Sequence, residues 1–282
     1  MVEHRRFGNL LPHLILLIGV VIVAFPVYLA IVASTHSDAL ISNGQMPLHP
    51  GSHGLETYWK TIVSGTGKTT REPVGNMMIS SLIMAVGIAV GKIAISIISA
   101  YAVVFFSFPF RMTAFWTIFI TLMLPVEVRI FPTYKIASDL HLLDSYSGLI
   151  LPLIASATAT LLFRQFFMTI PKELVEASKM DGAGPIRFFF DTLLPLSVTN
   201  IAALFVILFI YGWNQYLWPL LITTRDDMQT IVIGIKKIID VKDALTEWSV
   251  AMATAVLAML PPVAVVVLLQ RLFVKGLIET EK

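Results

Sequence analysis

The sequence predicts an all-α integral membrane protein with six transmembrane helices, and three observations support this fold class. Of its 282 residues, 56% are hydrophobic and only 13% are Asp, Glu, Lys or Arg, about half of the ~25% charged fraction of an ordinary soluble domain. The mean hydropathy is +0.81. Long uncharged apolar runs recur along the chain. A soluble globular domain and a disordered chain are both excluded, because neither is so poor in charge and so rich in apolar residues.

Six apolar runs of about 20 residues are each long enough to cross a ~30 Å hydrocarbon core as a helix. The first follows a basic start at Arg5 and Arg6 and is too long for the core of a signal peptide, so we expect an uncleaved anchor. The connections are too short for a folded soluble domain. The predicted spans are residues 10–33, 77–106, 113–131, 147–168, 198–222 and 249–270.

The distribution of Lys and Arg indicates which side of the membrane holds the termini. An even number of spans places both termini on one side, and that side carries nine Lys and Arg in 56 residues, against eight in 84 on the other. The higher density favours cytoplasmic termini, although the basic residues of the fifth connection point the other way. The predicted organisation is a tail and first helix over 1–33, a periplasmic loop over 34–76, a five-helix transmembrane domain over 77–272 and a cytoplasmic tail over 273–282.

Charge and cysteine content exclude several kinds of site. The net charge is +2 and no basic cluster is interleaved with aromatic residues, so a nucleic-acid partner is not expected. The chain has no cysteine, which excludes a disulfide framework, a thiolate metal site and a cysteine nucleophile. We expect neither a catalytic nor a metal site in this chain.

One segment of the 34–76 loop, Gly65-Thr66-Gly67-Lys68-Thr69-Thr70, looks at first like a nucleotide-binding loop. A phosphate cradle of that type needs a further glycine where this chain has Ile62, a buried strand before it and a helix after it. We therefore expect that this chain does not itself hydrolyse ATP.

The connection over 169–197 is polar but carries helix signals at both ends. Pro171 suits a first helical turn, Glu173 complements the positive helix start, and Gly182 suits a left-handed stop. A helix between them would be about 16 Å long, too short to cross the membrane. It either lies along the membrane surface or docks into another protein.

The residues of this connection resemble a family motif. Glu176-Ala177-Ser178, three residues, Gly182, nine residues and then Thr192-Leu193-Leu194-Pro195 resemble the EAA motif of ABC importer permeases, with Ser178 and Thr192 as departures. The resemblance implies a cytoplasmic coupling helix between transmembrane helices 4 and 5 that docks into a groove of an ATPase subunit. The residues that it assigns to ATPase coupling are Glu176, Ala177, Ser178, Gly182, Leu194 and Pro195.

Further stretches of the sequence indicate which branch of this permease family the chain resembles. Residues 99–102, 108–111 and 213–219 look like permeases of the carbohydrate-uptake branch, and residues 121–132 with 143–146 are similar to permeases of bacterial sn-glycerol-3-phosphate importers. The resemblance implies a bacterial inner-membrane complex of this chain, a second permease, two cytoplasmic ATPase subunits and a periplasmic binding protein, surrounded by membrane lipid. ATP and Mg²⁺ would be bound by the partner subunits and no cofactor by this chain. Another sugar, a polyol or a glycerophosphodiester remains an alternative substrate.

Lys92 is the candidate for a functional charge within the membrane. It lies near the middle of its predicted span, where a cation costs on the order of 2.5–3.5 kcal/mol unless it faces protein or water. Gly87 and Gly91 beside it favour close helix packing. We expect Lys92 or Arg129 to offer positive potential to a phosphate-bearing substrate, with a packed structural lysine as the alternative for Lys92.

Glu127, Arg129, Asn214 and Gln215 are further pathway candidates. The first two fall between Pro125 and Pro132, which should break or kink the third span, and broken helices often line substrate cavities. Glu127 would hold Arg129 in place, or the two form a structural ion pair. Asn214 and Gln215 either bond substrate or cap and crosslink helices.

Two other function classes fit the sequence less well. An ion-coupled secondary transporter would need an internal repeat, and none is visible. An intramembrane enzyme would need a cluster of catalytic residues within the spans, and the sequence has no such cluster.

Overall fold

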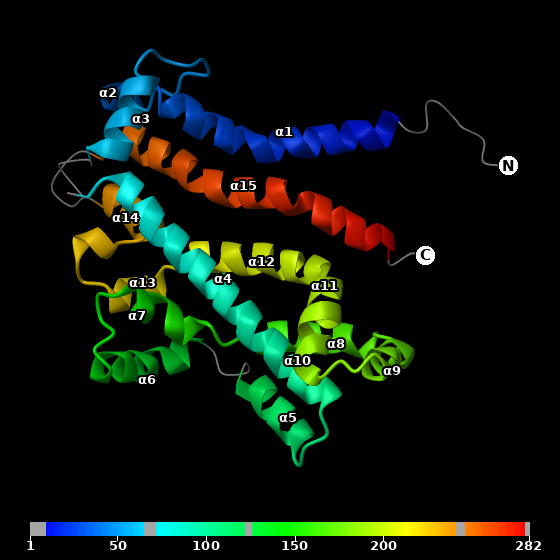
Figure 1. Ribbon diagram of the computed structural model, residues 1–282. Helices are drawn as coiled ribbons and strands as arrows, with labels where there is room; N and C mark the ends of the chain where they lie inside the picture. The colour runs from blue at the N-terminus through cyan, green and yellow to red at the C-terminus, as the bar shows by residue number, and fades with distance from the viewer. Residues whose placement is uncertain (1–9, 65–71, 122–125, 241–245, 280–282) are drawn as a thin grey trace. The chain divides into compact units, whose positions relative to one another are not determined.

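The computed structural model describes residues 10–64, 72–121, 126–240 and 246–279, and these residues form helices and connecting turns without a strand (Figure 1). The all-α prediction is therefore confirmed. The α-helices are α1 (Leu10–Ala33), α2 (Asp38–Ser42), α3 (Gly54–Val63), α4 (Val74–Phe105), α5 (Arg111–Thr121), α6 (Val126–Asp139), α7 (Tyr146–Ile150), α8 (Ala157–Met168), α9 (Lys172–Met180), α10 (Pro185–Phe188), α11 (Leu194–Leu196), α12 (Val198–Trp213), α13 (Leu217–Ile222), α14 (Ile231–Ile239) and α15 (Trp248–Glu279). Short 3₁₀ or π turns are η1 (Leu151–Leu153), η2 (Phe189–Leu193) and η3 (Asp226–Met228).

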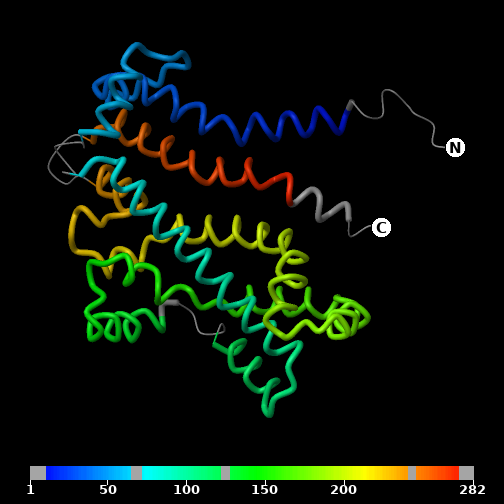
Figure 2. The backbone as a smooth tube through the Cα atoms, in the orientation of Figure 1, coloured from blue at the N-terminus to red at the C-terminus, as the bar shows by residue number. Residues whose placement is uncertain are grey.

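Three helices are long and apolar enough to cross a membrane, namely Leu11–Ala33, Val74–Phe105 and Trp248–Leu272. They correspond to the first, second and sixth predicted spans. The fourth predicted span is a bent pair, Tyr146–Leu153 and Ala157–Met168, with 52° between its parts. Figure 2 shows the change of direction between α7 and α8.

The fifth predicted span is shorter than expected. Instead of continuing to residue 222, α12 ends at Trp213 and α13 starts separately at Leu217. On its other side, α12 forms a bent pair with Pro185–Leu196, at 70°. Asn214 caps the end of α12 through its backbone N–H, and the polar pair Asn214 and Gln215 lies in the break between the two helices.

The third predicted span, over 113–131, is not a single helix in the residues described. Helix α5 has 11 residues and is about 16 Å long, too short for the ~30 Å hydrocarbon core. Helix α6 begins at Val126 and continues through Pro132, where a break or kink was expected. The described residues give three spans, or up to five if each bent pair counts as one, and the count of six is not confirmed.

The chain divides into two compact units, Met1–Asn76 with Gly234–Leu260 and Met77–Ile233 with Pro261–Lys282. In the first unit, the segment predicted as a loop over 34–76 contains helices α2 and α3. Its turn folds back on the end of α1, where the Gly51 and His53 N–H groups donate to Thr35 at 2.7 and 3.1 Å. The Asp38 carboxylate accepts the Ser249 N–H at 2.7 Å and so caps the start of α15. The glycine-rich stretch 65–70 lies outside the described residues.

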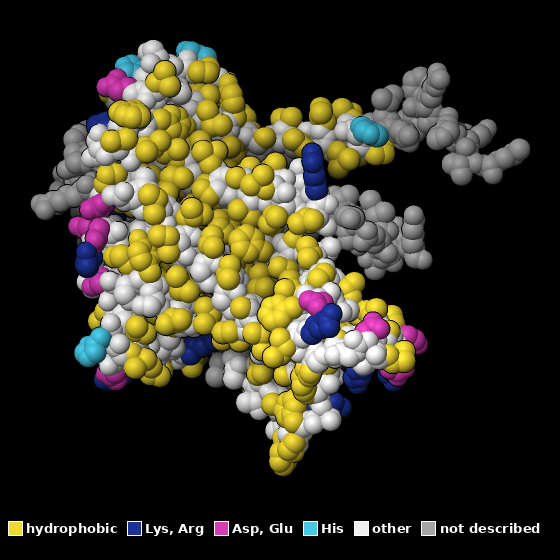
Figure 3. Space-filling view, viewed as in Figure 1, with side chains coloured by type: hydrophobic (Ala, Val, Ile, Leu, Met, Phe, Trp, Pro, Cys, Tyr) yellow, Lys and Arg dark blue, Asp and Glu magenta, His cyan; other side chains and the backbone are white. Residues whose placement is uncertain are grey.

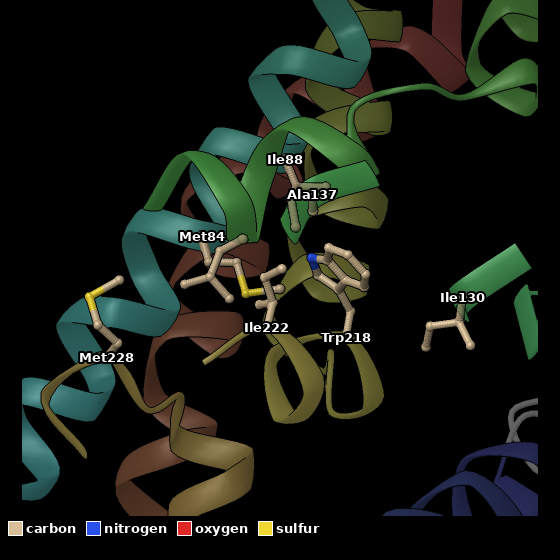
Figure 4. Packing of buried hydrophobic residues seen from close by; sticks show 8 residues of the cluster. Met84, Ile88, Ile130, Ala137, Trp218, Ile222 and Met228 are labelled. Carbon is tan, nitrogen blue, oxygen red and sulfur yellow. The ribbon is translucent and has the colours of Figure 1, made fainter. Parts of the chain in front are cut away.

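The second unit has a hydrophobic core in which α13 packs against α4 and α7 (Figure 4). Trp218, 3% exposed, is central to it, and its indole N–H donates to the Gly148 carbonyl at 3.1 Å. This hydrogen bond satisfies the indole N–H of Trp218, which would otherwise be a buried donor without a partner. The cluster consists of Met84, Ile88, Ile130, Ala137, Leu149, Trp218, Ile222 and Met228.

Apolar side chains are also abundant on the surface. Figure 3 shows hydrophobic side chains over most of the visible face, whereas charged side chains gather near α9 and α10 and along the left edge of the view. Along α1, most side chains from Leu11 to Phe25 are about half exposed or more. So large an apolar surface is typical of a chain that lies in lipid.

Candidate functional site

The first candidate site is the segment from α9 to α11, where the EAA-like residues lie. Helix α9 follows Pro171 and carries Glu173 in its first turn. Gly182 follows with a φ of +73°, a left-handed conformation that glycine adopts without strain. The predicted helix and its left-handed stop are both confirmed.

Helix α9 is open to its surroundings over its whole length. None of its residues is buried, and Glu176 and Ala177 are exposed while Ser178 is half-buried. Ala177 and Ser178 line a depression of about 230 Å³ that reaches Arg187 of α10 and Asp191 of η2. A carboxylate and small residues on an exposed short helix can pair with a basic group and permit close backbone approach.

Leu194 and Pro195, the last residues of the motif, lie where the helix type changes. The π turn η2 ends at Leu193 and α11 begins at Leu194. Pro195 has no N–H to donate to the carbonyl four residues earlier, which fits a change of helical hydrogen bonding at this point. Leu194 is half-buried and Pro195 is exposed.

The second candidate site surrounds Lys92 on α4. Its side chain is buried, with 7% exposure, and its Nζ lies 3.9 Å from the centroid of the Tyr211 ring. Arg129, exposed on α6, is near enough for its positive charge to act on Lys92. The structure thus brings together two of the cations that the sequence singled out.

Close helix packing holds this part of α4, as the two glycines predicted. A Cβ placed on Gly87 would lie 2.5 Å from Ile150, and one on Gly91 would lie 2.5 Å from Ile154. Both glycines therefore let the α7–η1 segment approach the α4 backbone.

Gln215 joins the Lys92 site through Tyr211, because its amide N–H donates to the Tyr211 carbonyl at 3.1 Å. Asn214 is exposed and its N–H donates to the Ile210 carbonyl at 3.1 Å. Glu127 lies in the first turn of α6, but its side chain is outside the described residues, and its pairing with Arg129 stays a prediction.

Sequence reasoning missed Tyr211 and the role of Tyr101. Tyr211 is one of four aromatic residues in the apolar run of α12, and its contact with Lys92 joins residues 119 positions apart, so no local pattern distinguishes it from the others. Tyr101 lies in a stretch that resembles the family, and its hydroxyl donates to the Pro185 carbonyl at 2.8 Å. A hydroxyl near the end of an apolar helix was the only available signal.

Comparison with known proteins places this geometry in a family. Residues 82–279 match the model of the family described as "Binding-protein-dependent transport system inner membrane component". The chain is 59% identical to the sn-glycerol-3-phosphate transport system permease protein UgpE of Rhizobium meliloti, and 54% identical to that of Yersinia pestis bv. Antiqua, each over 100% of both chains.

A solved structure shares the fold. It is described as a crystal structure of a bacterial ABC transporter involved in the import of the acidic polysaccharide alginate, and it superposes with a TM-score of 0.80 over 96% of this chain and 98% of the other. The two chains are 19% identical, so this likeness concerns the fold alone.

Proposed function

Because this chain belongs to the family of binding-protein-dependent transport system inner membrane components, we propose that it is a permease subunit of the ATP-driven importer of sn-glycerol-3-phosphate. One observation carries this proposal, namely the 54–59% identity over the full chain to permease proteins of that transport system. The chain is a transport subunit and not an enzyme. It forms half of the translocation pathway, and partner ATPase subunits bind ATP and Mg²⁺ and hydrolyse the nucleotide.

The exposed helix α9 is the point where the ATPase acts. A helix of nine residues spans about 13.5 Å and cannot cross the membrane, and its open surface suits a groove of another protein. Glu176 pairs with a basic residue of that groove, and Ala177 and Ser178 permit close approach. Gly182 turns the chain back toward α10. The assembly contains a second permease, two ATPase subunits and a periplasmic binding protein.

The Lys92 site attracts the phosphate group of the substrate. A cation buried near the middle of α4 is costly in an apolar surrounding, and a passing phosphate would offset that cost through charge-assisted hydrogen bonds. Arg129 adds positive charge nearby. Glu127 orients Arg129, and Asn214 and Gln215 border the same pathway.

The experiment is uptake by the complete importer in proteoliposomes, with sn-glycerol-3-phosphate, a glycerophosphodiester and uncharged glycerol as competing substrates. We expect ATP-dependent uptake of sn-glycerol-3-phosphate, and we expect that neither the glycerophosphodiester nor glycerol competes with it. Preferred uptake of another compound would reassign the substrate, and gradient-driven uptake without ATP would overturn the ABC mechanism.

Neutralising single lysines tests the pathway assignment. Lys92→Met is expected to reduce uptake at least tenfold while the complex still assembles. The matched control is Lys135→Met, since Lys135 is exposed and only pairs with Asp139 on its own helix. Normal uptake by a folded Lys92→Met complex would show that this lysine is structural.

The orientation of the chain in the membrane can be tested with single cysteine substitutions, because the chain has no cysteine of its own. With both termini in the cytoplasm, α9 is cytoplasmic and α3 is periplasmic. A membrane-impermeant maleimide added to intact spheroplasts should label Leu55→Cys on α3 but not Met180→Cys on α9, positions that are 92% and 83% exposed. The opposite labelling pattern would reverse the topology.

A further inference from the structure

A hydrogen bond ties the last part of α4 to the segment that follows α9. The Tyr101 hydroxyl donates to the carbonyl oxygen of Pro185, the first residue of α10, at 2.8 Å. The two residues are 84 positions apart, so the bond joins a transmembrane helix to the polar segment between two later helices.

Aromatic rings surround this hydrogen bond on both sides. The Tyr101 ring centroid lies 5.4 Å from Phe105 and 5.2 Å from Phe106 on its own side, and 5.1 Å from Phe189 on the other. Phe105 in turn lies 5.4 Å from Phe188, which is 7% exposed. Ring pairs at these distances pack in preferred geometries and hold their elements together.

Direct packing between α9 and α4 is incomplete. A cavity of about 180 Å³ lies between them, lined by Val175 and Lys179 from one helix and by Tyr101 and Phe105 from the other. The firm connection therefore runs through Pro185 and the phenylalanines after it, rather than through α9 itself.

Helix α4 links this contact to the buried cation. It runs without interruption from Val74 to Phe105, and Lys92 precedes Tyr101 by nine residues, about 13.5 Å along the axis. A continuous helix transmits a displacement at one end to the rest of its length. A shift of the α9–α10 segment would therefore move Lys92 relative to the Tyr211 ring on α12.

We propose that Tyr101 is a positioning residue that couples the α9–α10 segment to α4, so that ATP-driven movement of this segment changes the surroundings of Lys92. The inference rests on the proposed function of the chain as an importer permease. Tyr101 touches neither substrate nor nucleotide, and it acts through Pro185 at one end and through helix α4 at the other.

The first test measures uptake and ATP hydrolysis together in the reconstituted importer. Tyr101→Phe keeps the ring and removes the hydrogen bond, and we expect substrate molecules taken up per ATP hydrolysed to fall about fivefold, equivalent to about 1 kcal/mol at 1.4 kcal/mol per tenfold. Tyr101→Ala removes the ring as well and should lower this ratio further. Co-purification of the ATPase should remain normal in Tyr101→Phe.

Tyr146→Phe is the matched control, because the Tyr146 hydroxyl also contacts α4, at Ser80, 3.4 Å away and far from α9 along the helix. Its uptake per ATP should equal that of the wild type. An unchanged ratio in both Tyr101 variants would overturn the inference while leaving the proposed function intact. Absence of ATP-dependent uptake in the wild-type importer would instead count against the proposed function.

The second test does not depend on transport. Spin labels on Ile98→Cys of α4 and Ile186→Cys of α10, both exposed positions, report the distance between the two elements. In the chain that keeps Tyr101, the distance between the two labels should be the same with and without ATP. In Tyr101→Ala, the mean distance should change or its distribution should broaden when ATP binds. A distance that already changes with ATP when Tyr101 is present would refute the coupling.

Discussion

The ammonium group of Lys92 lies over the aromatic face of Tyr211, with Nζ 3.9 Å from the ring centroid. Lys92 is 7% exposed and Tyr211 is 36% exposed, so the ring covers a cation that is otherwise removed from water. A desolvated cation–π contact contributes about 2 kcal/mol, against on the order of 2.5–3.5 kcal/mol for inserting a lysine at mid-membrane. Tyr211 thus offsets much of the cost of keeping Lys92 on α4.

Two substitutions of Tyr211 distinguish the contribution of its aromatic ring to stability from that of its hydroxyl. Tyr211→Phe retains the aromatic face and should leave the free energy of unfolding nearly unchanged, whereas Tyr211→Leu should lower it by about 1–2 kcal/mol. Thermal unfolding of the purified complex measures both. In a Lys92→Met background the Leu substitution should cost less, and equal costs in the two backgrounds would mean that ring and cation do not interact.

Gly182 and Gly184 form a matched pair for testing the turn after α9. Neither would clash with an added Cβ, but Gly182 has a φ of +73° and Gly184 a φ of −71°. Gly182→Ala should therefore cost about 1–2 kcal/mol locally, displace α9 and reduce both ATPase co-purification and uptake. Gly184→Ala should retain both, and equal behaviour of the two variants would exclude the left-handed turn as the reason for glycine at position 182.

Gly212 lets α12 approach α4 closely. A Cβ there would lie 2.9 Å from the Cα of Ala85, and a backbone atom cannot move aside as a side chain can. Gly212→Ala should destabilise the protein by about 1–3 kcal/mol, measured as a lower thermal unfolding midpoint. Gly19→Ala in α1 is the control, since nothing lies within 4 Å of its added Cβ. A midpoint for Gly212→Ala as high as that of the control would contradict the close approach.

Asp144 fastens the connection after α6 to the one after α13. Its carboxylate accepts hydrogen bonds from the Thr224 N–H at 2.5 Å, the Thr224 hydroxyl at 2.6 Å and the Arg225 N–H at 3.0 Å. The Thr224 hydroxyl above all, then the two backbone N–H groups and the Arg225 charge, hold the pKa of Asp144 below its usual value, partly offset by desolvation.

A depressed pKa in the folded state gives a defined dependence of stability on pH. The contribution of Asp144 is fully present above the pKa of an unfolded aspartate, about 3.9, and is lost as the pH falls through the lower folded value. Asp144→Asn should therefore lower the unfolding midpoint at pH 6, and its difference from the wild type should shrink below about pH 4. Asp139→Asn, at an exposed i, i+4 pair with Lys135, should have little effect at either pH. A difference for Asp144→Asn that is constant across this range would exclude the pH linkage.

Local signals predicted the segment around α9 well. Helix propensity, end charges and a glycine that tolerates positive φ all act within a few residues, and they correctly predicted a helix that ends before Gly182. Hydropathy likewise located the long helices α1, α4 and α15. Close helix packing at Gly87 and Gly91 also followed from sequence, because small residues in apolar helices permit close contact, whereas the isoleucines that they meet did not.

Helix breaks within apolar runs were harder to predict. The residues before Trp213 and after Leu217 are apolar, and the two polar residues between them, Asn214 and Gln215, are too few for a long-window hydropathy average to divide the run into two helices. The separation of α12 from α13 depends on distant contacts, including the Trp218 indole N–H donating to the Gly148 carbonyl and Asp144 binding the residues after α13. For the third predicted span the sequence did carry a local signal, because Pro125 predicted a break or kink, and α5 ends at Thr121 while α6 begins at Val126.

Composition, periodicity and motif spacing are local properties, and they were enough to identify an all-α membrane protein with a polar EAA-like helix. The contacts between distant residues became known only from the folded chain, namely Lys92 with the ring of Tyr211 and Tyr101 with the carbonyl of Pro185. Such contacts join positions about 80 to 120 residues apart, and they depend on how helices pack and bend. That packing is set by the sum of many weak interactions across the fold, and no short stretch of sequence records it.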